Sequence, residues 1–530
     1  MATAGILSRV IGLLYNSPMT AIIGDEGNGY YEFAYRAYTI ILLVSSYSIP
    51  SAISKVIASY LATGEYKNAQ RIFRGAFLYV LIIGAIAGTA VFFFADMLVQ
   101  IEGSATVLKF FAPTILFSGM LGVFRGYFQA HRTMTQTSIS QILEQGVNAL
   151  ASILLALWLT GLVPVEETTK RSVYGASGGA IGTGIGVLSG LLLMCAIYAL
   201  NLKMVKKRIA ADSHPEELSY RVIFKMILLV VTPFILSTCI YNVNTYLNQS
   251  VFIHSMHLRG LADAQVATLN SAIGKATKIS TIPIAISSAM SAALIPGIAG
   301  DFKIGRLDLC RDSVAKAIRG TMFVAIPAAL GIMALSEPLL LFLYPQPETL
   351  DLSTRLLMVL APGVVLYSLS TLSGAVLQGT GRLNAPVINA AIALALQTFF
   401  LVAMLELGGI EPEFAPFVMV MAVVLFALLM CILNGVSVRR HLAYHQEWER
   451  AFVRPLLISL LMGAVAFGAY HGLYVLIGIN IVSLCLAVII GVLVYFIFAI
   501  RWQVLGAGEL KWLPRSEKLI GLVEKIGKRS

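Results

Sequence analysis

Eight of the polar side chains that stand inside long apolar stretches of this sequence are candidate functional residues. They comprise four cations, two carboxylates and two amides: Arg9, Arg36, Lys275, Lys278, Glu32, Glu144, Asn244 and Gln129. A charge at the centre of a bilayer costs about 2.5–3.5 kcal/mol on insertion scales, so such residues usually serve a function. We expect the cations and amides to be substrate-binding residues. We expect Glu144 and Glu32 to bind a coupling ion, either Na⁺ or H⁺.

These residues also have purely structural interpretations. Glu32 and Arg36 stand at i,i+4 spacing and could simply pair on one helix. Asn244 could hydrogen-bond a neighbouring helix. Lys275 could snorkel to the nearby loop, and Arg125 is close enough to the end of its segment to do the same. Lys278 and Glu144 are harder to explain in this way, because each lies about three turns from either loop.

The elements that carry these residues are predicted to be transmembrane helices. The chain has 530 residues, of which 58% are hydrophobic and only 12% charged, and its mean hydropathy is +0.83. About 20 apolar residues span a bilayer, and no loop is long enough to hold a separate domain. We therefore predict an all-α polytopic membrane protein with about fourteen spans: 2–23, 31–60, 73–95, 105–129, 135–161, 175–200, 222–250, 265–298, 313–336, 352–378, 385–407, 413–437, 452–474 and 477–500.

The charges of the connecting loops predict the orientation. Every second connection is rich in Lys and Arg, as in the basic loop 202–221, whereas the connections between them are acidic or mixed. Lys and Arg accumulate on the cytoplasmic side, so both termini are expected in the cytoplasm. The tail 501–530 carries apolar and basic residues at helical spacing and is expected to lie on the anionic inner leaflet.

An internal repeat predicts the domain organisation. The sequence Ile-Pro-Ser-Ala-Ile-Ser at 49–54 resembles Ile-Pro-Ile-Ala-Ile-Ser at 282–287, and the turns 64–67 and 300–303 also match. A shared orientation of both halves implies an axis along the membrane normal, with the substrate path between the halves. The predicted divisions are an N-lobe 1–201, a cytoplasmic linker 202–221, a C-lobe 222–438, two further spans within 451–500 and the tail 501–530.

Several function classes are disfavoured. No segment fits the G-x-x-x-x-G-K-[ST] phosphate-binding motif, so transport would use an ion gradient, the membrane potential or the substrate's own gradient. The five cysteines are scattered, which argues against disulfides and zinc. No metal site, cofactor or catalytic constellation stands out. The net charge of +11 follows from the basic loops and does not indicate nucleic acid.

Six short segments together resemble a known family. They are 8–13 (SRVIGL), 24–27 (GDEG), 49–55 (IPSAISK), 126–129 (GYFQ), 140–145 (SQILEQ) and 377–382 (LQGTGR), followed by Pro386. The combination resembles the bacterial polysaccharide-biosynthesis and stage V sporulation protein B family. This family includes lipid II flippases and sits in the superfamily of multidrug, oligosaccharidyl-lipid and polysaccharide exporters.

The resemblance implies two six-helix lobes around a central cavity, with two further helices forming a lipid-facing groove. It implies a flippase in the bacterial cytoplasmic membrane whose substrate is an undecaprenyl-pyrophosphate-linked saccharide. Arg9 and Lys278 fall where lipid II flippases carry cavity cations. Membrane lipids and cell-wall synthesis proteins are the expected partners. A cation-coupled multidrug antiporter and a non-transporting scaffold of a wall-synthesis complex are the alternatives.

Overall fold

The chain folds almost entirely into helices. The computed structural model describes residues 2–43, 49–212, 214, 217–502 and 504, and no strand occurs among them. The all-α polytopic prediction is confirmed, and ten helices of this described part are long and apolar enough to cross a bilayer. The predicted spans 2–23 and 31–60 fall on α1 (Ala2–Leu42) and α2 (Ile49–Ala62), and 222–250 and 265–298 fall on α8 (Tyr220–Leu258) and α9 (Asp263–Lys303).

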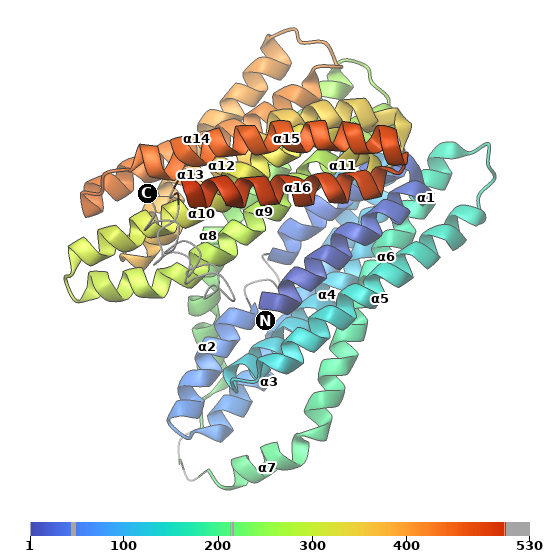
Figure 1. Ribbon diagram of the computed structural model, residues 1–530. Coiled ribbons are helices and arrows are strands. Elements are labelled where there is room, and N and C mark those ends of the chain that lie inside the picture. The colour runs from blue at the N-terminus through green and yellow to red at the C-terminus, as the bar shows by residue number, and fades with distance from the viewer. Residues whose placement is uncertain (1, 44–48, 213, 215–216, 503, 505–530) are drawn as a thin grey trace. The chain divides into compact units, whose positions relative to one another are not determined.

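The remaining helices follow the predicted spans, except that α7 lies in the predicted linker 202–221 and α11 lies between two predicted spans (Figure 1). Their bounds are α3 (Tyr66–Leu98), α4 (Glu102–Ala130), α5 (Met134–Gly161), α6 (Thr168–Leu200), α7 (Leu202–Ala210), α10 (Leu307–Ala334), α11 (Ser336–Leu343), α12 (Pro347–Gly379), α13 (Asn384–Val402), α14 (Ala415–Leu442), α15 (Arg454–Ile477) and α16 (Asn480–Arg501). Two π-helical turns, Ala403–Leu407 and Glu449–Val453, lie between these helices. The predicted tail 501–530 lies almost entirely outside the described residues.

The chain divides into two compact units, Met1–Ser271 (unit 1) and Ala272–Ser530 (unit 2). The division falls inside α9 and not in the basic segment 202–221. The reason is that α8 packs against α1, α2 and α3 and so belongs to unit 1. The lobes predicted from the repeat are divisions of the sequence, and their boundaries stay a prediction.

The first predicted loop, between residues 23 and 31, is instead part of α1. Only Gly24 departs from helical geometry, with φ 71° and ψ 179°. Asp25 is buried, and its Oδ1 accepts a hydrogen bond from Ser271 Oγ at 3.1 Å. A Cβ on Gly29 would lie only 1.9 Å from the Ala267 carbonyl oxygen, so glycine allows α1 to approach the start of α9 closely. Acidic residues suggested a loop, but these contacts bury the segment.

The glycines at four-residue spacing in α6 form a packing seam. A Cβ would lie 2.6 Å from the Ala156 nitrogen at Gly178, 2.4 Å from the Ser152 nitrogen at Gly182, and 2.7 Å from the Glu144 carbonyl oxygen at Gly186. Small residues let helix backbones approach and gain van der Waals contact in the absence of a hydrophobic driving force. The seam fixes α5, which carries Glu144, against α6.

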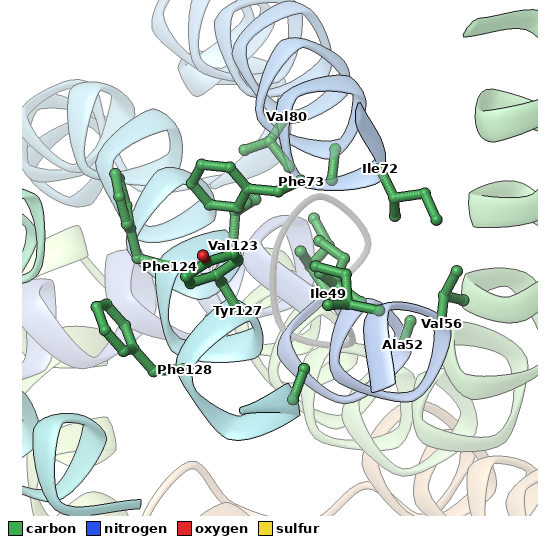
Figure 2. Close-up of a cluster of buried hydrophobic side chains, with 14 of the residues drawn as sticks. Ile49, Ala52, Val56, Ile72, Phe73, Val80, Val123, Phe124, Tyr127 and Phe128 are labelled. Atoms are coloured by element: carbon green, nitrogen blue, oxygen red, sulfur yellow. The ribbon is translucent and has the colours of Figure 1, made fainter. Parts of the chain in front are cut away.

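A cluster of buried hydrophobic side chains in unit 1 joins α2, α3 and α4 (Figure 2). Phe73 of α3 lies with its ring centroid 5.4 Å from Phe124 and 4.7 Å from Tyr127, both on α4. Such ring pairs each contribute about 0.5–1.5 kcal/mol. Pro50 is the second residue of α2, where the missing backbone N–H costs no helical hydrogen bond. This core holds the ends of three helices together.

In unit 2, α10, α12 and α14 pack together, and α15 and α16 form a pair that rests on α10. Gly478, with φ 71°, ends α15 and allows the turn into α16. Tyr495 of α16 donates its hydroxyl hydrogen to the Phe323 carbonyl oxygen at 2.9 Å. The two additional C-terminal helices therefore attach to the unit through α10.

Candidate functional site

Lys275 is enclosed among the helices of unit 2. Its exposed fraction is 1%, so it does not snorkel to the loop. Its Nζ donates a hydrogen bond to Thr349 Oγ1 at 2.8 Å and lies 5.6 Å from the centroid of the Tyr344 ring. The residue lies twelve positions into α9, which is roughly 18 Å along the helix. The chain therefore keeps a cation deep in a membrane-spanning helix, held by a hydroxyl and an aromatic face.

Lys278 follows Lys275 by three residues and lies on the neighbouring part of the same α9 surface. It is half-buried, whereas Lys275 is fully buried. Two ammonium groups at this spacing repel each other and together attract an anion. The described part of unit 2 thus places two lysines within one turn of α9.

Glu144 on α5 forms an ion pair with Arg125 on α4. Arg125 Nη2 donates to Glu144 Oε2 at 2.6 Å, and Arg125 Nε donates to Ser140 Oγ at 3.1 Å. The side chains are only 18% and 16% exposed, respectively. Snorkelling of Arg125 to the loop is thus the wrong interpretation, since its guanidinium turns to α5. Sequence spacing could not predict this pair, because the two residues lie on different helices.

Glu32 and Arg36 lie one turn apart on α1, and the charge of Glu32 acts on Arg36. Glu32 is buried and Arg36 is half-buried. The same helix stretch packs its aromatic rings on α4, with the Tyr38 ring centroid 4.7 Å from that of Phe111. Their pairing stays a prediction, as do their predicted roles in substrate binding and ion coupling.

The other predicted residues lie apart from these clusters. Asn244 on α8 is buried, and its Oδ1 has no hydrogen-bond partner among the residues that the structure describes. Gln129 is half-buried near the end of α4. The side chain of Arg9 lies outside the described part of the chain. The structure therefore brings Lys275 near Lys278 and Glu32 near Arg36, and it adds Arg125 to Glu144.

The described residues contain no group of three or more His, Cys, Asp or Glu side chains that could hold a metal ion. Four cysteines of the described part, Cys195, Cys310, Cys431 and Cys485, are free thiols. What the arrangement offers chemically is therefore fixed charge inside spans. The paired charges of Arg125 and Glu144 offset each other, whereas Lys275 and Lys278 present two cations on one helix.

Two family models match parts of this chain, and both concern the sequence comparison alone. The family model described as polysaccharide biosynthesis protein matches residues 1–300, and the MatE model matches residues 252–403. The lipid II flippase MurJ of Bacillus subtilis (strain 168) is 24% identical over 482 residues, which cover 86% of this chain and 85% of that protein. Stage V sporulation protein B of the same organism is 22% identical over 534 residues, which cover 98% and 97% of the two chains.

A solved structure of a lipid II flippase MurJ in an inward closed conformation has a similar fold. The TM-score is 0.70 at 16% identity, and the match covers 95% of this chain and 98% of that one. At this identity the likeness concerns the fold alone.

Proposed function

This chain belongs to the polysaccharide biosynthesis protein family, and from that premise we propose that it flips an undecaprenyl-pyrophosphate-linked saccharide across the bacterial cytoplasmic membrane. The chain is a multi-pass membrane transporter and not an enzyme. The proposed cargo is a lipid II-like precursor or a polysaccharide repeat unit, and the proposed mechanism is alternating access.

The observation that carries the proposal is the enclosed cation on α9. A pyrophosphate must cross a hydrocarbon layer, and cations along its path lower the cost of that crossing. Lys275 is enclosed beside Thr349 and Tyr344, and Lys278 lies one turn further along the same helix. Keeping two lysines there is costly, and an anionic cargo provides a reason for the cost.

We propose that Lys278 and Arg9 each contact the pyrophosphate during its passage. Lys278→Arg should retain flipping and Lys278→Ala should lose it, because charge is the requirement at Lys278. Arg9→Lys should be only partly tolerated, since an arginine can bind phosphate oxygens in a bidentate manner. Complementation of a strain depleted of its lipid II flippase tests these variants, after immunoblotting confirms that each is present in the membrane. Well-expressed Lys278→Ala and Arg9→Ala proteins that support growth would overturn the assignment.

Glu144 and Glu32 are proposed as the residues that couple transport to Na⁺ or H⁺. Glu144→Gln or Glu32→Gln should then abolish the dependence of transport on that ion in proteoliposomes. The membrane potential alone supplies about 2.3 kcal/mol per charge per 100 mV. Transport that follows the potential and is unchanged by either substitution would make both carboxylates structural.

A cation-coupled multidrug antiporter is the second candidate, and the MatE match at 252–403 favours it. The lysines of α9 argue against cationic drugs, because they would repel them. Ethidium efflux from cells that express the chain distinguishes the candidates. Efflux that persists in Lys278→Ala, together with failed complementation by the unsubstituted chain, would replace the flippase proposal.

Both termini are proposed to lie in the cytoplasm. In a cysteine-free background, cysteines at Leu258 and Leu407 should react with an impermeant thiol reagent from outside intact cells, whereas a cysteine at Lys206 should not. All three residues are exposed. Asn68 would be a poor choice for the inside position, because it is buried and its Oδ1 accepts the Leu218 N–H at 2.9 Å. Labelling at Lys206 from outside would reverse the orientation.

A further inference from the structure

A cavity of about 160 Å³ lies in unit 1 where several membrane helices end. Leu61 near the end of α2, Tyr66 at the start of α3 and Phe128 near the end of α4 line it on one side. Met204 and Arg208 of α7 line it on the other side. Because these helices end here and residues of α7 line the cavity, we infer that it lies at the boundary between the bilayer and water.

The short helix α7 has two different faces. Asn201, Met204, Val205 and Arg208, at i, i+3, i+4 and i+7 spacing, line the cavity, as does Ile209. Lys203, Lys206 and Lys207 are exposed and are not among the lining residues. The helix therefore covers a largely apolar cavity with one arginine and presents three lysines elsewhere on its surface.

The charge of Arg208 is not neutralised by the nearby acids. Asp212 accepts hydrogen bonds from the backbone N–H groups of Lys67 at 2.7 Å and His214 at 2.9 Å. Glu65 accepts from Thr63 and Asn68, both at 2.8 Å, and Glu217 pairs with Arg71. Within the described ranges no carboxylate forms an ion pair with Arg208 or with the three lysines.

His131 completes the polar part of the cavity without adding charge at neutral pH. Its Nδ1 lies 2.9 Å from the Tyr127 carbonyl oxygen, which can only accept, so Nδ1 carries the proton. Burial lowers the pKa of the His131 imidazole, and the charge of Arg208 lowers it further. Arg208 is therefore the cation of this cavity.

We propose that this cavity binds the headgroup of an acidic glycerophospholipid, with the lipid phosphate at Arg208 and the glycerol and first acyl carbons against Leu61, Phe128 and Met204. Cationic pockets at the cytoplasmic ends of membrane helices are suited to such headgroups. The apolar lining favours a lipid over a free phosphate, which would gain nothing from it. The three lysines of α7 attract the anionic surface from which the lipid comes.

Native mass spectrometry of the purified full-length chain tests this proposal. The probes are phosphatidylglycerol and phosphatidylcholine with identical acyl chains, added at equal concentration. The unsubstituted chain should retain phosphatidylglycerol preferentially. Arg208→Gln should weaken its binding on the order of tenfold, as expected for a charge-assisted hydrogen bond to phosphate.

Lys206→Gln is the matched control, because it removes the same charge from the same helix at an exposed position away from the cavity. It should change binding by less than about twofold. Met204→Trp should fill the cavity from its rim and reduce binding without removing any charge. Equal losses in Arg208→Gln and Lys206→Gln would show a diffuse surface effect and overturn the site.

Full binding in Met204→Trp would also overturn the site, since the cavity would then not be needed. Displacement of the lipid by millimolar glycerol 3-phosphate or inorganic phosphate would assign the cavity to a free anion instead. Equal retention of phosphatidylcholine would exclude recognition of an acidic headgroup. These measurements report lipid binding alone, so they are independent of which cargo the chain transports.

Discussion

Arg125 in unit 1 and Lys275 in unit 2 are both cations in membrane-spanning helices, but the chain holds them in different ways. Arg125 donates to a carboxylate, Glu144, and to Ser140. Lys275 donates to a hydroxyl, Thr349, and lies over the Tyr344 ring. Glu144 offsets the charge of Arg125, whereas the contacts that Lys275 makes with Thr349 and Tyr344 are a neutral hydrogen bond and an aromatic face. The comparison sets a cation held by an ion pair beside a fully buried lysine that we propose serves an anionic cargo.

Lys275 provides the largest expected effect. Lys275→Met keeps the length of the side chain and removes its charge, so flipping in reconstituted vesicles should fall to background. The fold should persist, because leaving the buried Thr349 hydroxyl without this partner costs about 1–3 kcal/mol, a fraction of the stability of a typical protein. Thr349→Val is the matched control, since it removes the hydroxyl and leaves the charge, and it should retain most activity. A Lys275→Met variant that flips at the wild-type rate would contradict the proposed functional difference between Lys275 and Arg125.

Substitutions in the Arg125–Glu144 pair should lower the free energy of unfolding more than Lys275→Met does. Glu144→Ala leaves a largely buried guanidinium unpaired and should destabilise the protein by about 2–4 kcal/mol, measured by thermal unfolding. Arg125→Leu combined with Glu144→Leu should recover most of this loss, since neither charge remains buried. Asp96→Ala, which breaks the more exposed Lys109–Asp96 pair, should cost about 1 kcal/mol or less. A double variant as unstable as Glu144→Ala would contradict a structural role for the pair.

The glycine seam tests whether unit 1 positions Glu144 through helix packing. Gly182→Ala places a Cβ 2.4 Å from the Ser152 nitrogen and should cost about 1–3 kcal/mol. Gly146→Ala on α5 is the control, because nothing lies within 4 Å of its Cβ position, and it should stabilise α5 by roughly 0.5–1 kcal/mol. Equal thermal midpoints for Gly182→Ala and Gly146→Ala would show that the contact between α5 and α6 accommodates the added Cβ without a loss of stability.

The smallest expected effect concerns the segment after α7. The backbone N–H groups of Lys67 and His214 lower the pKa of Asp212 to about 2, below the usual value of about 3.9 for an unfolded chain. The stability that ionised Asp212 adds is therefore fully present above about pH 4 and is lost as the pH falls through about 2. Asp212→Asn should lower the thermal midpoint slightly at pH 7 and match the unsubstituted chain near pH 2.

The helices were largely predictable from the sequence, because a run of apolar residues long enough to span a bilayer has few alternatives to a helix. The segment at Asp25 was the exception, where acidic residues suggested a loop and contacts with the start of α9 bury them instead. Of the candidate residues, only the closeness of Glu32 and Arg36 on α1 follows from their i,i+4 spacing. The partners of Glu144 and Lys275 could not, since Arg125 and Thr349 lie on other helices.

The length and spacing of the apolar stretches by themselves determined that this chain is a helical membrane protein. The position of each charged residue within such a stretch showed that placing it in the bilayer is costly. Those properties are local, because the bilayer acts on each segment according to its own composition. Which charge meets which partner was decided by the tertiary structure alone. The seam of small residues brings the backbones of α5 and α6 together. The packing around α9 encloses Lys275 beside Thr349. Both contacts depend on shape complementarity between segments far apart in the sequence, which no single segment specifies.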